Sequence, residues 1–281
     1  MKHYKILLFL GLAFTLTYAF LGCALKETPA EDFSYDIIDG EISITGYNGT
    51  EREIRIPKKI ADRPVTKIGS EAFSGYDLVS IKFPNTLTII GNNAFEYCSC
   101  LESIEIPKTV EKIGEKAFYH CSALEKVSIP DTITKIPERC FSSCKSLIKI
   151  DIPASVTTIC NAAFEYCEKL ETANLPDNDE LYLEDDCFKE CTNLKKLYLP
   201  RNARMEMGYE SQSSYNPTLG SYVSVTFVST PIDYYINSSF NSNVFNQNHE
   251  DDTVIVVKKD STAHEQLKKY SSYDIKYEVE D

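Results

Sequence analysis

The sequence predicts a repeat solenoid, and three observations support this fold class. Prolines recur every 23 residues, with a last one after 24 residues, at Pro84, Pro107, Pro130, Pro153, Pro176 and Pro200. The short motif Ala-Phe-x-x-Cys, or a close variant of it, recurs at the same spacing. Between each motif and the next proline, apolar and polar residues alternate. A fixed period of roughly 20–50 residues indicates stacked units, each of which buries its apolar face only against its neighbours.

Each unit is expected to contain a β-strand in the segment that ends at the proline. From Leu101 to Pro107, the pattern Leu-x-x-Ile-x-Ile-Pro has the period of two residues that is typical of a strand with one buried face. Proline ends the strand because it has no N–H for backbone pairing. Parallel strands stacked in this way form a right-handed coil with a parallel β-sheet on its inner, concave face.

The second half of each unit is expected to turn the chain back toward the next strand. Val110 and Ile113 are predicted to point inward, and Gly91 and Gly114 to allow a tight turn. The Ala-Phe-x-x-Cys motif then follows on the convex side. Its phenylalanines are expected to form one stacked column: Phe95, Phe118, Phe141, Phe164 and Phe188.

Both ends of the array are expected to be caps, because the open ends of a solenoid core must be covered. Residues 35–46 alternate around Gly40 and predict a short hairpin as the N-terminal cap. Residues 201–281 are expected to form the C-terminal cap; a separate binding module built from their many tyrosines is the alternative. Within them we expect an irregular loop at 201–221, strands within 222–228 and 253–257, a helix from Ser261, and a last strand around Tyr277.

The composition is that of an ordinary globular protein, and it argues against several functions. Of the 281 residues, 43% are hydrophobic and 25% charged, and the net charge is −13. Nucleic acid and anionic lipid are not expected as general partners, because both require basic surfaces. We find no Ser/His/Asp or Cys/His set, no phosphate-binding glycine loop and no metal-ligand spacing. The sequence therefore predicts a protein that is not an enzyme and that uses no cofactor or metal.

Seven of the ten cysteines are expected to be buried thiols in two columns of the repeat, rather than a disulfide framework. Cys140 and Cys187 replace alanine in a column of small residues, which suits a free thiol that packs as a small hydrophobe. Neighbours in a column would lie about 4.8 Å apart, but parallel side chains give poor torsion angles for a disulfide. Five others share one column of the repeat: Cys98, Cys121, Cys144, Cys167 and Cys191.

The N-terminal segment has the pattern of a secretion signal. It has a basic head at residues 2–5 and an apolar stretch at residues 6–22, followed by polar residues. Phe20-Leu21-Gly22-Cys23 resembles the lipobox of bacterial lipoproteins, which implies cleavage before Cys23 and lipidation of its thiol. We therefore expect a signal peptide at residues 1–22 and a polar tether at residues 23–34. Ordinary secretion and an uncleaved anchor are the alternatives.

The repeat itself resembles the BspA-like (Treponema-type) leucine-rich repeat, over roughly residues 50–200. Its pattern is Leu-x-x-Ile-x-Ile-Pro-x-x-Val-x-x-Ile-Gly-x-x-Ala-Phe-x-x-Cys, and Pro137, Cys160 and Glu184 replace the turn glycine in three units. The resemblance implies a leucine-rich-repeat superhelix, which we place with its N-terminal cap at residues 35–200. It also implies a surface-exposed protein that binds other proteins, often in adhesion.

In each predicted strand, two side chains between the buried positions face outward, and they differ from unit to unit. Five of these side chains are basic and three acidic, a balance opposite to that of the whole chain. We predict that this face binds a protein partner of acidic character. The alternative is that these residues only keep the strands solvated. The candidate contact residues are Arg55, Lys82, Glu105, Lys126, Lys149, Asp151, Lys196 and Tyr198.

The sequence thus predicts a membrane-anchored lipoprotein of the bacterial cell envelope, displayed at the surface, that binds other proteins through its repeats. One alternative is a periplasmic scaffold that assembles envelope components. A second alternative is a carrier of a small apolar ligand, which would need an exposed apolar pocket.

Overall fold

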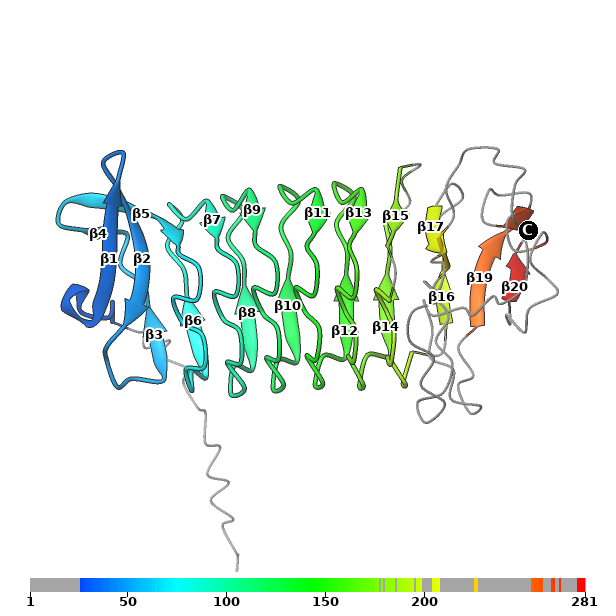
Figure 1. Ribbon diagram of the computed structural model, residues 1–281, viewed down its shortest axis with the longest axis horizontal. Helices are drawn as coiled ribbons and strands as arrows, with labels where there is room; N and C mark the ends of the chain where they lie inside the picture. Colours follow the sequence, from blue (N-terminus) through cyan, green and yellow to red (C-terminus); the bar gives the residue numbers. More distant parts are fainter. Residues whose placement is uncertain are drawn as a thin grey trace, which may run out of the picture.

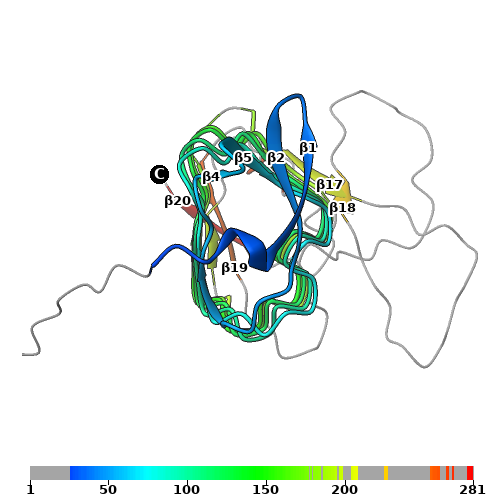
Figure 2. The same cartoon turned by 90° about the vertical axis from the view of Figure 1, so that its left-hand side faces the viewer.

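The structure is a computed structural model, and it forms an elongated stack of similar turns (Figure 1). It describes residues 26–176, 178, 180–184, 186–194, 196–198, 204–207, 225–226, 254–259, 264–265, 268 and 277–280. Seen along the stack, the turns superimpose in one closed, flattened outline (Figure 2). Short strands follow one another in parallel from turn to turn, which confirms the predicted solenoid.

One row of strands is the predicted sheet, which we call the ladder sheet. In the strands whose side chains are all described, the middle residue points toward the core and its two neighbours are more exposed, as the period of two predicts. Where neighbouring strands of this sheet pair, they run parallel and in the same register. The strands are β3 (Glu53–Arg55), β6 (Ser80–Lys82), β8 (Ser103–Glu105), β10 (Lys126–Ser128), β12 (Lys149–Asp151), β14 (Thr172–Asn174) and β16 (Lys196–Tyr198).

A second row of strands, the short-strand sheet, follows the proline in each turn. The sequence predicts inward-pointing residues here but no strand. Most of these strands have only two residues, which is too short for an alternating pattern to be visible in the sequence. They are β7 (Ile89–Ile90), β9 (Lys112–Ile113), β11 (Lys135–Ile136), β13 (Thr158–Ile159), β15 (Tyr182–Leu183) and β17 (Arg204–Met207).

β17 corrects the prediction that residues 201–221 form an irregular loop. Arg204 pairs with Tyr182 and Met205 with Leu183 in parallel, so the repeat continues beyond Pro200. The sequence of β17 lacks the apolar spacing of the other units, and backbone pairing with β15 gives it its conformation instead. β18 (Val225–Thr226) pairs with β17 in the antiparallel direction.

The ladders of both sheets are interrupted. In the described chain, no backbone pairing joins β9 to β11 in the short-strand sheet, or β10 to β12 in the ladder sheet. Pro137 explains the first interruption. In other turns the residue at this position donates its N–H to the preceding turn, as Gly114 does to Ile90 O at 2.8 Å and Cys160 to Ile136 O at 3.0 Å. Proline has no N–H to donate.

The third side of the stack, which we call the loop face, has a continuous ladder. It consists of the Ala-Phe-x-x-Cys turns at residues 71–76, 93–98, 116–121, 139–144, 162–167 and 186–191. Along it, backbone N–H groups donate to carbonyls of the following turn at 2.7–3.0 Å. Phe95 N–H, for example, donates to Ala117 O, and Tyr97 N–H to Tyr119 O, both at 2.8 Å.

This ladder requires a left-handed backbone at two residues in each turn. The residues before the Ala and Cys positions have φ between +50° and +61°, although they are not glycine; among them are Asn93, Tyr97, Lys116 and His120. Such a conformation costs energy for residues other than glycine. Here the conformation is stabilised by hydrogen bonds from the N–H groups of these residues to carbonyls of the next turn.

The predicted turn glycines have a different role from the expected one. Neither Gly91 nor Gly114 has positive φ. A Cβ atom on Gly91 would lie 2.7 Å from the backbone of Gly69 and Ser70, and one on Gly114 would lie 2.4 Å from Asn92 N. These glycines allow successive turns to approach closely, rather than allowing an unusual backbone angle.

The core between the three sides is closely filled. The predicted phenylalanine column is confirmed, and it begins one unit earlier, at Phe73. Successive rings from Phe73 to Phe188 lie 5.2–5.5 Å apart and within 8° of parallel.

A column of side-chain hydrogen bonds, which was not predicted from the sequence, joins each turn to the preceding one, as from Thr86 to Val65 O and from Thr109 to Leu87 O. Thr132, Ser155 and Asn178 continue it.

The nine described cysteines are free thiols. The predicted column of buried thiols is confirmed, and each thiol donates to the phenylalanine carbonyl of the preceding turn. The Cys98 Sγ lies 3.0 Å from Phe73 O, and the Cys144 Sγ lies 3.3 Å from Phe118 O. The cysteine column therefore satisfies backbone acceptors in the core.

The predicted N-terminal hairpin is also confirmed. β1 (Phe33–Ile38) and β2 (Glu41–Tyr47) are antiparallel, and Asp39 and Gly40 between them both have positive φ, as a two-residue hairpin turn requires. β2 then pairs in parallel with β5 (Arg63–Ile68), which also pairs with the short strand β4 (Lys59–Ile60). A 3-10 turn, η1 (Ala30–Asp32), precedes the hairpin.

At the other end, β19 (Val254–Lys258) and β20 (Tyr277–Glu280) extend the ladder sheet in parallel beyond β16. These are the strands expected within residues 253–257 and around Tyr277. His264, Glu265 and Lys268 are helical, as the predicted helix requires. The rest of that helix, and the predicted strand within 222–228 apart from β18, lie outside the described residues. Among the helices that the structure describes, none has the length and apolar character of a membrane span.

Candidate functional site

The candidate site from sequence lies on the outward face of the ladder sheet, which we call the ladder face. Lys82, Glu105 and Lys126 are exposed there, and Tyr198 is 52% exposed. Arg55 is half-buried. Lys196 lies on β16, and its side chain is outside what the structure describes. The sheet thus places the candidates on one face, in strands that follow each other along the stack.

Strand register determines which of their charges lie next to each other along the face. Arg55 lies opposite Lys82 on the neighbouring strand. Ser80 lies opposite Ser103, which brings Glu105 to the position next to Lys82. Glu105 in turn lies opposite Ser128. The basic pair is therefore at the N-terminal end of the face, and an acidic residue follows it directly.

Lys149 and Asp151 form an ion pair with each other. The Lys149 Nζ lies 3.0 Å from Asp151 Oδ1, and both side chains are more than half exposed. The Asn174 side-chain amide also donates to Asp151 Oδ1 from the next strand. The hydrogen bond from Asn174 and the pairing with Lys149 lower the pKa of Asp151. The pair involves one basic and one acidic residue, so the positive excess expected for the ladder face is unchanged, but Lys149 itself contributes little to it because its charge is neutralised locally.

The loop face has an exposed aromatic cluster that the sequence analysis did not select. The Tyr97 and His120 rings are stacked with centroids 4.9 Å apart, and the Tyr119 ring meets both edge-on. Tyr97 is 51% exposed. Burial and the nearby Lys145 lower the pKa of His120, so its ring is neutral near pH 7. The signal for this cluster was present in the sequence as a second variable column, the residue before each Cys.

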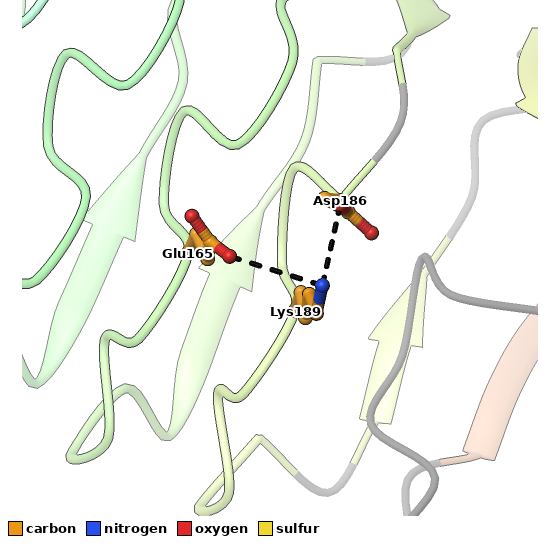
Figure 3. Close-up of polar contacts among 3 residues, drawn as sticks. All are labelled: Glu165, Asp186 and Lys189. Atoms are coloured by element: carbon orange, nitrogen blue, oxygen red, sulfur yellow. Dashed lines mark hydrogen bonds and ion pairs between the residues drawn. The ribbon is translucent and has the colours of Figure 1, made fainter. Parts of the chain in front are cut away.

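A charged cluster lies on the same face, farther along the stack (Figure 3). The Lys189 Nζ lies between two carboxylates, 3.4 Å from Asp186 Oδ2 and 3.9 Å from Glu165 Oε1. Burial raises the pKa of both Glu165 and Asp186, while Lys189 and Arg139 act in the opposite direction. A partly buried ion-pair network of this kind perturbs pKa values without any catalytic role.

A cavity of about 370 Å³ opens between β9 and β11, where Pro137 interrupts the short-strand sheet. It follows directly from the missing backbone pairing described above. Its lining is mixed, with Asn92, Glu111, Lys112, Glu115, Thr134 and Lys135 beside Ile113 and Ile133. Such a lining does not favour the carrier of a small apolar ligand, because apolar ligands require a predominantly apolar pocket.

Thiol and metal chemistry receive no support in the described part of the chain. Burial raises the pKa of Cys98 to about 12 and places the pKa of Cys121 and Cys144 well above the ordinary range. Such thiols are poor nucleophiles, since the thiolate is the reactive form. Within the described residues, no three His, Cys, Asp or Glu side chains are grouped so that they could hold a metal ion.

The geometry defines a parallel β-solenoid of leucine-rich repeats, a fold class that typically serves as a binding scaffold without enzymatic activity. The sequence model of the BspA-type leucine-rich repeat region matches residues 66–195 and 117–216, with six copies. The chain belongs to this family. Among curated proteins, none matches the sequence.

Solved structures of bacterial proteins share the fold. A leucine-rich repeat protein of T. pallidum is 28% identical, and the match covers 60% of this chain and 91% of that one, with a TM-score of 0.52. A leucine-rich cell surface protein of Faecalibacterium prausnitzii is 32% identical over 66% of this chain, with a TM-score of 0.58. A protein of Eubacterium ventriosum is similar in fold, at 22% identity over 67% of this chain and a TM-score of 0.52.

This chain matches about half of the last two proteins, 51% and 54% of their respective lengths.

Proposed function

We propose that this protein is a lipid-anchored binding protein of the bacterial cell surface, and that it contacts a protein partner through the ladder face. The observation that supports this most strongly is the contrast within each strand. The buried middle position is apolar in every described unit, whereas its two outward neighbours range over acidic, basic, hydroxyl and aromatic side chains. An array that repeats its interior and varies its exposed strand positions is suited to recognition.

The surface location is supported by the cell surface protein of F. prausnitzii, which shares the fold and a third of its residues over the matched part. Lipidation of Cys23 is supported by the basic head, the apolar stretch and the cysteine that follows Gly22. Acyl chains anchor through the burial of their methylene groups, about 0.8 kcal/mol each. Two chains or more would hold the array firmly at a bilayer.

The partner surface is proposed to be acidic where it meets Arg55, Lys82 and Lys126, and less charged farther along the stack, where Lys149 is paired. Rim charges of this kind change the rate and salt dependence of association more than the final affinity. Lys126 is the best position for a test, since it is exposed in the middle of the array.

The test is to reverse this charge and measure association with a partner that has been captured by cross-linking on living cells. Lys126→Glu should slow association by roughly tenfold at low salt and flatten its salt dependence. Lys112→Glu is the matched control, because Lys112 is also exposed, on β9 of the other sheet, and the change in net charge is the same. If the two variants bind like the unmodified protein, the ladder face is not the contact surface.

Surface display is separated from the periplasmic alternative by protease treatment of intact cells. A displayed protein should be cleaved while a periplasmic marker stays intact. Protection of this chain until the outer membrane is permeabilised would instead support the scaffold that assembles envelope components.

A further inference from the structure

The N-terminal hairpin exposes more apolar surface than its role in the fold requires. Of the large hydrophobic residues that are exposed in the described chain, three lie on β1: Tyr35 at 37%, Ile37 at 52% and Ile38 at 51%. After the buried Phe33, every residue of β1 is exposed. Figure 1 and Figure 2 show the tip of this hairpin projecting beyond the outline of the stacked turns.

β2 makes most of the contacts with the core, and β1 contributes only the buried Phe33. Ile42, Ile44 and Tyr47 on β2 are at most 1% exposed, and the Tyr47 ring lies 6.2 Å from Phe73, the first ring of the phenylalanine column. β1 pairs with β2 on one side only, so it is an edge strand with isoleucines in solvent. Proteins normally avoid such edges, because they promote association.

The chain connects this end of the array closely to the proposed lipid anchor. Thr28 is buried against β3: its N–H donates to Arg55 O at 2.9 Å, and its Oγ1 accepts from Arg55 N–H at 3.0 Å. Only four residues lie between Cys23 and Thr28 along the sequence, and these five residue steps span at most about 18 Å when extended. A lipid on Cys23 therefore holds the hairpin end of the stack at the bilayer surface.

We propose that the β1–β2 hairpin inserts Tyr35, Ile37 and Ile38 into the membrane interface beside the lipid anchor, and so fixes the orientation of the array relative to the bilayer. This inference rests on the proposed lipidation of Cys23. Apolar side chains with a neighbouring tyrosine are suited to the boundary between headgroups and acyl chains. Because the lipid already holds the hairpin at the bilayer, the hairpin is present there at a high effective concentration. A small apolar contact is then sufficient for insertion.

The charges near the hairpin tip determine which lipid composition favours its insertion. The hairpin contains Asp36, Asp39 and Glu41, and the adjacent strands β4 and β5 contribute Lys59 and Arg63; the Arg63 Nη1 donates to Gly40 O at 3.3 Å. With both signs present, attraction to anionic lipid is not expected, and insertion should occur in zwitterionic bilayers and be insensitive to salt. A second copy of the chain is a poorer occupant, because pairing two hairpins would bring their acidic residues together.

Tryptophan fluorescence tests the proposal without background, because the chain contains no tryptophan. Ile38→Trp is prepared in the lipidated protein and reconstituted into phosphatidylcholine vesicles with and without brominated acyl chains. Ile148→Trp is the matched control, since Ile148 is 44% exposed in the middle of the array. The Ile38→Trp emission should shift to the blue and be quenched several-fold more by the brominated lipid than that of the control. Tyr35→Trp serves as a second reporter if Ile38→Trp lowers the melting temperature.

Vesicle flotation and the mass of the N-terminal peptide report the anchor independently. If the protein floats with acylated Cys23 but neither hairpin tryptophan is quenched more than the control, the hairpin inference is wrong and the anchoring stands. If Cys23 is not acylated and the protein does not float, both proposals fail. A blue shift that grows with the protein-to-lipid ratio, without quenching by brominated lipid, would assign the hairpin to a second copy and overturn the membrane contact.

Discussion

The loop face and the ladder face of this solenoid are built from the same repeat but differ in regularity. On the loop face, backbone hydrogen bonds run from turn to turn, and behind them lie the stacked phenylalanines and the cysteine thiols. On the ladder face, the strands have three residues and their pairing is interrupted. Turn stacking therefore depends mainly on the loop side, and the ladder face is left free to vary its exposed side chains.

The largest expected difference concerns the phenylalanine column. Phe118→Ala should destabilise the protein by about 3–5 kcal/mol, because it removes a fully buried ring between two stacked neighbours. Lys126→Ala on the ladder face should change the free energy of unfolding by less than about 0.5 kcal/mol. Urea unfolding followed by circular dichroism measures both. Similar losses for the two variants would mean that the ladder sheet contributes to the fold as much as the loop face.

A smaller effect is expected where successive turns approach most closely. Gly114→Ala should cost about 1–3 kcal/mol, because its Cβ would meet the backbone of Asn92 and force the turns apart. Gly75→Asn is the control on the loop face: Gly75 has φ of +73° with open space around its Cβ position, and asparagine tolerates that angle. The same unfolding measurement applies. A harmless Gly114→Ala would show that the turn spacing can relax.

The buried thiols predict a loss of stability at alkaline pH. Burial raises the pKa of Cys98 from its ordinary value of 9.0 to about 12. The folded state therefore keeps a proton that the unfolded state releases, so this contribution is complete below pH 9 and is lost as the pH rises toward 12. The melting temperature should fall over this range, and replacing Cys98 by alanine should make that fall shallower. A parallel fall in the variant would exclude Cys98 as a cause.

The smallest effect expected concerns thiol access in the native state. Cys100 is partly exposed, whereas the cysteines of the column are buried behind the loop face. Iodoacetamide at about pH 8 should modify Cys100 first and the column only after unfolding, since reactivity follows thiolate character and exposure. Peptide mapping by mass spectrometry measures the order. Modification of Cys121 or Cys144 as fast as Cys100 would show that the loop face opens readily.

The solenoid, the ladder strands, the phenylalanine column and the hairpin could be predicted from the sequence because each depends on local spacing. Phe95 and Phe118 stack because they occupy the same position of adjacent units. The short-strand sheet was missed because two-residue strands such as β9 have no period to detect. β17 was missed because its conformation depends on pairing with β15, and the left-handed angles of Tyr97 and His120 depend on carbonyls in the following turn.

The candidate site could be predicted only as a face. Alternation along β8 or β12 shows which residues point outward, and the structure agrees. Alternation does not show which charged side chains contact one another. The pairing of Lys149 with Asp151, and the approach of Asn174 from the next strand, depend on side-chain conformations and strand register, which a residue count does not contain. The aromatic cluster of Tyr97, Tyr119 and His120 likewise depends on turns that lie side by side.

The central claim is that partners bind the ladder face, and site-specific photo-crosslinking on living cells tests it most directly. A photoreactive residue is introduced at Ser128 on β10 or at Thr134 just before β11, two exposed positions of the same turn on different sheets. We predict that the partner is captured from Ser128 and not from Thr134. Capture from Thr134 alone, or equally from both positions, would contradict the assignment of the ladder face as the binding surface.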